Sequence, residues 1–226
     1  KPHQSVCDPE ISMEIQLYYA PITCSLVPYI TLTEAGAEFE VMPINMRKGQ
    51  NKTPEYLKLN PKHKVPVLVV NGEPLSENVA IQIWIARNFP KAQLLPQDPW
   101  QELKAISMLS WCSSGIHPYL SLIHSPLKVC DLPEAEESIL KKSTEIVFDC
   151  FSMAEDLLKG REYFFDHFTA SDAHFFWCYR RASQFELDLS SFPICAAHFE
   201  RMQTRDSVQK LIGFEKKIQA QFAGAA

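Results

Sequence analysis

The sequence predicts a two-part fold, in which an α/β unit with a mixed sheet is followed by an all-helical unit. Short strand and helix patterns alternate over residues 13–90. Three prolines then fall within ten residues, at 90, 96 and 99, and indicate a linker. Beyond residue 97 the apolar residues follow helical spacing, and no strand pattern is convincing. A chain of 226 residues is long enough for two such units.

The first unit is expected to have the element order β-α-β-α-β-β-α. A helical crossover joins the first two strands, so these strands should run parallel. Asn71-Gly72 lies between two apolar runs and predicts a tight antiparallel hairpin. Thr53 before Pro54 predicts the start of a short helix. The segments are, in order, 14–19, 25–36, 38–44, 53–60, the hairpin within 65–77, and 78–90.

The second unit starts with two long helical patterns, at residues 100–124 and 133–160. Thr169 and Asp172 have the spacing of a capping box at the start of a further helix. The second long pattern should bury one stripe, formed by Ile139, Ile146, Cys150, Met153 and Leu157. The predicted domains are a polar extension at 1–12, the α/β domain at 13–90, a linker at 91–97 and the helical domain at 98–226.

Composition narrows the class of protein. The formal net charge of −5 argues against binding to nucleic acid, which needs clustered Lys and Arg. No apolar run approaches the ~18 residues of a membrane span, and the first residues show no signal-peptide pattern. The seven cysteines are odd in number, irregularly spaced and without metal-ligand spacing, so free thiols are expected. We therefore expect a globular protein of the reducing cytoplasm that binds no metal, nucleic acid or membrane.

Three motifs in this order resemble those of the cytosolic glutathione transferases. KVPVL, residues 64–68, is similar to the Val-Pro step that opens the third strand of their thioredoxin-like domain, where the proline is cis. LSENVAI, residues 75–81, is similar to their Glu-Ser turn, and FTASDAHFF, residues 168–176, to the capping box of their helical domain. The resemblance covers roughly residues 13–213. It implies a thioredoxin-like N-terminal domain, glutathione as co-substrate and a homodimer.

Within this family the nearest resemblance is to the bacterial beta class. LYYAPITCSL, residues 17–26, is similar to the signature stretch of that class, in which Cys24 occupies the cysteine position. The class also uses a histidine from the first long helix of the helical domain, a position that His117 matches. Two residues depart from the class: Pro118 replaces a lysine, and Asn78 replaces serine or glycine. Pro118 is expected to kink the helix.

The resemblance implies a catalytic group of Cys24, Ser25 and His117. Cys24 and Ser25 begin a helix, whose N-terminal N–H groups and dipole favour an anion, so the pKa of the Cys24 thiol should be lowered. Ser25 and its neighbour Thr23 are expected to donate to the glutathione sulfur, and His117 to donate to glutathione or to polarise a substrate. The residues alone also allow plainer roles: a small residue that fills a turn, two helix caps and a half-exposed histidine.

The resemblance also implies a glutathione-binding group. Val65 should pair its backbone with the cysteinyl part of glutathione, while cis-Pro66 holds that edge of the sheet open. Glu77 should accept the γ-glutamyl ammonium, and the backbone N–H of Asn78 should bind its carboxylate. On the residues alone, an ordinary edge strand and a helix N-cap remain open.

Lys64 and Tyr19 complete this binding group. Lys64 is expected beside a glutathione carboxylate, and Tyr19 behind the residues that contact the sulfur. A solvated lysine and a packed strand tyrosine are the plainer alternatives.

The predicted function is that of a glutathione transferase acting on a hydrophobic electrophile or on a glutathione mixed disulfide. Conjugation needs only an activated glutathione thiolate, whereas thiol transfer needs Cys24 itself as nucleophile. The alternative is a non-catalytic protein of the same fold that serves in binding or regulation.

Overall fold

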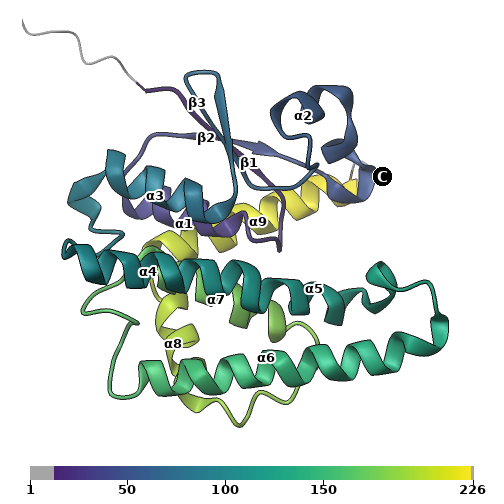
Figure 1. Cartoon of the computed structure of the whole chain (residues 1–226). Helices are drawn as coiled ribbons and strands as arrows, with labels where there is room; N and C mark the ends of the chain where they lie inside the picture. The colour runs from purple at the N-terminus through teal and green to yellow at the C-terminus, as the bar shows by residue number, and fades with distance from the viewer. Residues whose placement is uncertain (1–12, 225–226) are drawn as a thin grey trace, which may run out of the picture.

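The computed structural model describes residues 13–224, so the predicted extension at 1–12 and the last two residues lie outside the described part. Figure 1 shows a sheet at the top and layers of helices beneath it. The predicted fold class is confirmed: an α/β part with a four-stranded sheet comes first, and the rest of the described chain is helical. The division into domains at residues 91–97 stays a prediction.

The sheet is mixed, as predicted, and has the order β2-β1-β3-β4. Strand β1 runs parallel to β2, and β3 is antiparallel to both β1 and β4. Asn71 and Gly72 connect β3 to β4 with φ of 50° and 86°, the left-handed conformations that a two-residue hairpin turn needs. The strands are β1 (Ile15–Tyr19), β2 (Glu40–Pro43), β3 (Val67–Val70) and β4 (Glu73–Ser76).

Helices cover both faces of the sheet. Helices α1 (Leu26–Glu34) and α3 (Asn78–Asn88) pack on one face, and α2 (Pro54–Leu59) lies near the other. Successive residues of β3 point to opposite faces of the sheet. Leu68 belongs to the large core, and Val67 belongs to a smaller cluster with Tyr56 of α2. The short helix begins where predicted, because the Thr53 side chain accepts a hydrogen bond from the Tyr56 N–H at 3.3 Å.

The helical part contains α4 (Pro99–Trp111), α5 (His117–His124), α6 (Glu136–Leu158), α7 (Ala170–Ala182), α8 (Pro193–Gln203) and α9 (Asp206–Gly224). The first predicted helix is divided, because five residues between α4 and α5, Cys112–Ile116, are π-helical. Pro118 lacks an N–H and stands in the first turn of α5, where a proline is tolerated. The π-helical segment ends at Ile116, and the α-helical pattern resumes with α5 at His117. No helix in residues 13–224 is long and apolar enough to cross a membrane.

The predicted stripe of α6 is only partly right. Cys150 is buried, but Met153 and Leu157 are 49% and 52% exposed. The buried face is displaced around the helix and includes small residues, because α5 and α8 pack against it. Its members are Ser143, Val147, Cys150, Phe151, Ala154 and Leu158.

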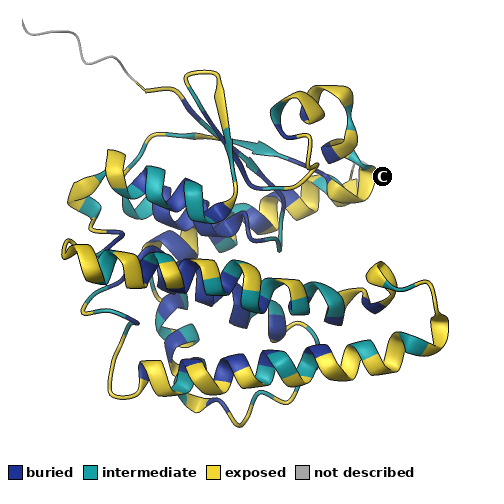
Figure 2. Ribbon diagram, viewed as in Figure 1, coloured by how far each residue is buried: buried dark blue, intermediate teal, exposed yellow. Residues whose placement is uncertain are grey.

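Helix α7 is the centre of the molecule. Figure 2 shows α1 and α7 as mostly buried, whereas α6 is exposed along its outer side. α7 contacts α1, and α9 returns to α1 from the far end of the chain. One hydrophobic core therefore runs from the sheet into the helical part. Five of the six described cysteines are buried, and all six are free thiols, as predicted for these positions.

Candidate active site

The Cys24 turn, residues 20–25, joins β1 to α1. The Ala20 carbonyl accepts hydrogen bonds from the Thr23 hydroxyl at 2.8 Å and the Ser25 hydroxyl at 2.9 Å. The Ala20 N–H in turn donates to the Ser25 oxygen at 3.0 Å, and Ser25 is fully buried. The Ser25 side chain closes the turn, with its hydroxyl on the backbone of Ala20, and its predicted role toward the glutathione sulfur stays a prediction.

Cys24 belongs to this turn and faces the residue before cis-Pro66. Its thiol faces the Val65 carbonyl at 3.8 Å, and the Asn78 side chain donates to the Cys24 carbonyl at 3.0 Å. Burial raises the pKa of the thiol to about 12, although its own backbone N–H acts in the opposite direction. The predicted lowering of this pKa is wrong, because the residue is only 7% exposed and desolvation outweighs the helix terminus. At neutral pH Cys24 is a thiol that can donate a hydrogen bond.

The Val65-Pro66 peptide bond is cis, as the resemblance implied. Side chains of α2 and of its C-cap residue donate hydrogen bonds to the loop that leads to this peptide bond. The Lys64 carbonyl accepts from the Tyr56 hydroxyl at 2.7 Å and from the Asn60 amide at 2.8 Å. These supporting residues were not predicted, since no local pattern distinguishes a buried tyrosine or asparagine that holds a loop from one that packs. The Lys64 side chain is exposed.

Glu77 and Asn78 stand at the start of α3. The Glu77 carboxylate is exposed and pairs with the Lys62 ammonium, which also donates to the Ser76 hydroxyl at 2.8 Å. The first N–H groups of α3, including that of Asn78, have no partner within the helix and are suited to an anion. The Asn78 side chain has a role the sequence did not predict, because it ties α3 to the Cys24 turn.

Three of the six described non-glycine residues with positive φ lie near these residues. Ile22, His63 and Glu77 have φ of 70°, 48° and 74°, a left-handed conformation that costs energy for residues with a side chain. Ile22 lies two residues before Cys24, His63 directly before Lys64, and Glu77 directly before α3. Strained residues of this kind concentrate at functional sites. The strain therefore supports the location of the site independently of the motifs.

Tyr19, the last residue of β1, faces the C-terminal helix α9. It is fully buried, and its hydroxyl donates to the Glu215 carboxylate of α9 at 3.0 Å. The same carboxylate accepts the Ile22 N–H at 2.7 Å and pairs with Arg180. Tyr19 is therefore linked to the Cys24 turn through Glu215, and its place behind the residues that contact the sulfur stays a prediction. Glu215 was missed, although a carboxylate between Leu211 and Ile218 on an apolar face was a signal.

His117 is linked to the Cys24 turn by Trp177, which contacts both. The Trp177 indole donates to the Ile22 carbonyl at 3.1 Å, and the His117 ring lies edge-on to the indole, with ring centres 4.4 Å apart. Burial, helped by the charges of Lys128, Lys64 and Arg181, lowers the pKa of His117 to about 4. The imidazole is therefore neutral at pH 7, with one nitrogen able to donate and the other to accept.

The structure thus brings Cys24, Val65, Pro66 and Asn78 into one group, with Glu77 and Lys64 beside it. His117 comes from the helical part, and the charge of Lys64 contributes to the lowering of its pKa. Among the described residues there is no group of three His, Cys, Asp or Glu side chains placed to hold a metal ion. The fold and the site together define a class of protein. Its members have a thioredoxin-like sheet, a cis-proline that faces a turn containing a cysteine, and a helical part joined to the sheet.

Comparisons with known proteins agree with this class. Residues 13–87 match the family of the glutathione S-transferase N-terminal domain. The chain is 30% identical over 205 residues to the glutathione S-transferase GstA of Escherichia coli O157:H7, which covers 89% of this chain and 98% of that protein. The chain belongs to the glutathione S-transferase family of enzymes.

Two solved structures give the same result. A bacterial beta-class glutathione S-transferase from Sphingomonas chungbukensis superposes with a TM-score of 0.78 at 28% identity, over 88% of this chain and 98% of that one. A sphingomonad glutathione S-transferase complexed with glutathione superposes with a TM-score of 0.77 at 26% identity, over 89% of this chain and 98% of that one.

Proposed function

We propose that this protein is a cytoplasmic enzyme that joins glutathione to electrophilic substrates at the Cys24 site. The observation that carries the proposal is the contact of the Cys24 thiol with the Val65 carbonyl, directly before cis-Pro66. A peptide that adds to this edge of the sheet would pair its backbone with Val65. The central cysteine of glutathione bound in this way would place its sulfur beside Cys24.

The two ends of glutathione also have suitable partners. The γ-glutamyl carboxylate would bind the free N–H groups at the start of α3, which include that of Asn78. Its ammonium would bind the Glu77 carboxylate, whose present partner, Lys62, is an exposed side chain in a weak surface pair. Lys64 is exposed and would lie beside the second carboxylate.

The chemistry we infer is conjugation. The N-terminus of α1 favours a thiolate on glutathione, and the neutral Cys24 thiol would donate its S–H to that sulfur. The thiolate then forms a bond to the electrophilic carbon, and the leaving group departs with its electron pair. Thiol transfer through Cys24 is less favoured, because the raised pKa of Cys24 leaves little thiolate to act as nucleophile. His117 in its neutral form would donate to the substrate or to the leaving group.

We also propose a homodimer. Trp100 and Leu103 on α4 are 65% and 56% exposed, which is unusual for two large apolar side chains one turn apart. A second copy would remove them from water.

Binding of glutathione tests the proposal. Calorimetric titration of reduced glutathione into the wild type should show binding, and Glu77→Ala should weaken it by ~10-fold because a charge-assisted hydrogen bond is lost. Glu73→Ala removes an exposed carboxylate from the same hairpin and should bind as the wild type does. Absence of binding at millimolar glutathione would rule the proposed site out.

Cys24→Ala separates conjugation from thiol transfer. We expect conjugation of glutathione to a chlorodinitrobenzene to fall by no more than ~10-fold, the cost of one hydrogen-bond donor. Reduction of a glutathione mixed disulfide through Cys24, if the wild type shows it, should disappear. Conjugation abolished in a variant with wild-type thermal stability would contradict the role of hydrogen-bond donor and make Cys24 essential to the reaction.

A further inference from the structure

A row of rings and cations continues from the candidate site along the seam between α5 and α7. His117 of α5 meets Trp177 of α7 with ring centres 4.4 Å apart, and His124, two turns further along α5, stacks on Phe185 at 6.1 Å. Arg181 lies between the two pairs: it follows Trp177 by one helical turn, and its guanidinium stands 4.5 Å from the centre of the Phe185 ring. The seam thus leads from the Cys24 turn to the end of α5.

Arg181 is half-buried without a carboxylate partner. Its Nη1 donates to the Gln184 side chain at 2.9 Å, and it forms no ion pair within residues 13–224. Of the other partly buried arginines, Arg180 and Arg205 pair with Glu215 and Glu34, whereas Arg201 donates to the Glu162 carbonyl at 2.7 Å. A guanidinium that stacks on an aromatic ring, is partly withdrawn from water and lacks an anion keeps N–H donors free for an anionic ligand.

Lys128 reinforces the positive charge at this place. Its ammonium donates to the Ser121 hydroxyl at 3.0 Å, one turn of α5 beyond His117. Lys128, Lys64 and Arg181 all act on the His117 ring, and neither lysine has a carboxylate partner among the described residues. In a protein with a net charge of −5, a cluster of cations without counter-ions is suited to binding an anion.

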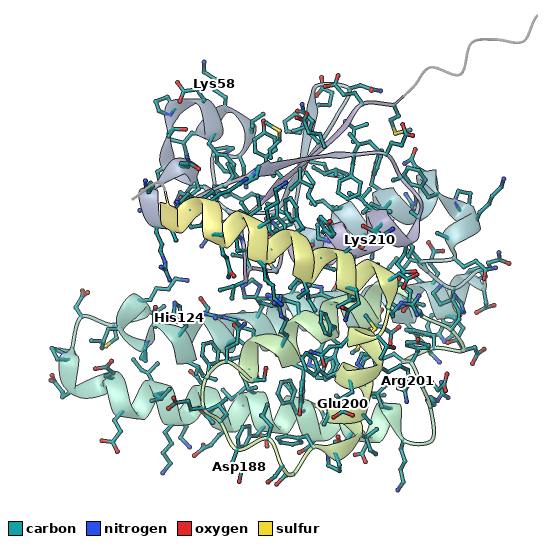
Figure 3. All side chains as sticks on the ribbon, turned by 180° about the vertical axis from the view of Figure 1, so that it is seen from behind. Lys58, His124, Asp188, Glu200, Arg201 and Lys210 are labelled. Atoms are coloured by element: carbon teal, nitrogen blue, oxygen red, sulfur yellow. The ribbon has the colours of Figure 1, made fainter. Side chains whose placement is uncertain are left out.

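An open cavity of about 490 Å³ lies beyond Gln184 and Phe185, and Arg181 itself does not line it. Its walls include Gln184 and Phe185, the two groups that Arg181 contacts, together with His124. In Figure 3, His124 lies at the end of α5 beneath the α/β part. Most of the remaining wall is apolar, with Ile123, Leu140 and Leu187, and Glu186 is its one acidic member. The volume is within the range of small-molecule sites.

We propose that the second substrate of this enzyme is an amphipathic carboxylate. Its anionic group binds Arg181 and Lys128, its electrophilic ring lies on the Trp177 side and meets the glutathione sulfur near Cys24 and His117, and an apolar substituent beyond the anionic group would extend over Phe185 toward the cavity. One helical turn separates Trp177 from Arg181, about 6 Å along the axis, which is the length of a substituted benzoate. The inference rests on the proposed function and narrows its substrate class.

A matched pair of electrophiles tests this inference. A chlorodinitrobenzoate and its methyl ester react with glutathione in the same way: a carbon–sulfur bond forms, the carbon–chlorine bond breaks, and chloride leaves with the electron pair. They differ in the charge that Arg181 would bind. The ratio of kcat/KM for the carboxylate to kcat/KM for the ester should fall ~10–100-fold in Arg181→Gln, since a hydrogen bond to a charged group is lost.

Controls distinguish charge from fold. Lys104→Gln makes the same change of net charge on the exposed side of α4 and should keep the wild-type ratio. Arg181→Lys should recover part of the loss, and Lys128→Gln should lower the ratio in the same direction, which keeps the test valid should Arg181→Gln fail to fold. An unchanged ratio in folded Arg181→Gln, or a wild type that turns over the ester alone, would overturn the inference and leave the proposed function standing. If the wild type turned over neither compound, this inference and the proposed function would both be contradicted.

Discussion

Replacing Asp172 with alanine is expected to lower the free energy of unfolding by about 3–5 kcal/mol, because it removes the shared partner of a buried polar cluster. Asp172 is fully buried. One carboxylate oxygen accepts the Phe164 N–H and faces the His198 ring, each at 3.0 Å. The other accepts the Thr169 N–H at 2.9 Å and the Thr169 hydroxyl at 3.0 Å.

Unfolding in urea, followed by the midpoint and slope of the transition, measures this effect. Asp156→Ala removes an exposed carboxylate from α6 and should change the stability by less than about 0.5 kcal/mol. If Asp172→Ala were as stable as that control, the cluster would not be holding α7, α8 and the preceding loop together.

Replacing Glu215 with alanine is expected to cost about 3–5 kcal/mol as well, because Arg180 then loses its partner in a partly buried position. The Tyr19 hydroxyl and the Ile22 N–H lose their acceptor in the same change. Since Ile22 has φ of 70° and stands two residues before Cys24, the variant should also conjugate glutathione more slowly at temperatures where it is folded.

Thermal unfolding and conjugation rates of the same preparation test both parts. Tyr19→Phe keeps the ring and removes one hydrogen bond, so it should cost only about 1 kcal/mol. Glu200→Ala, at an exposed position of α8, should be neutral in both measurements. A Glu215→Ala variant with the stability of Tyr19→Phe would show that the pair with Arg180 contributes nothing.

The parts of the fold that sequence patterns predicted are those whose signals are local. Asn71-Gly72 forms the hairpin turn because these residues adopt positive φ readily. Thr53 and Thr169 start helices because a side-chain oxygen beside an apolar run can satisfy free N–H groups. The cis-proline was implied by family resemblance, which adds information that a local pattern lacks.

The site was predicted less well, for a physical reason. A helix start predicts a low pKa for Cys24, but burial against Val65 has the larger effect and reverses it. Ser25 was expected to contact the glutathione sulfur and Tyr19 to lie behind it, but their hydrogen-bond partners, Ala20 and Glu215, were not predicted. Burial and hydrogen-bond partners come from residues far away in the chain, which no local pattern contains.

The sequence by itself determined the order of the elements in the α/β part, the mixed sheet, the hairpin, the helix starts at Thr53 and Thr169, and the family, because short-range propensity and motif spacing suffice for these. Only the tertiary structure decided which polar groups are buried and what they face. The carboxylate of Glu215 holds a turn 193 residues away at Ile22, and Arg181 has no counter-ion among the residues that fold around it. Long-range packing sets desolvation and charge proximity, and these set the chemistry of the site.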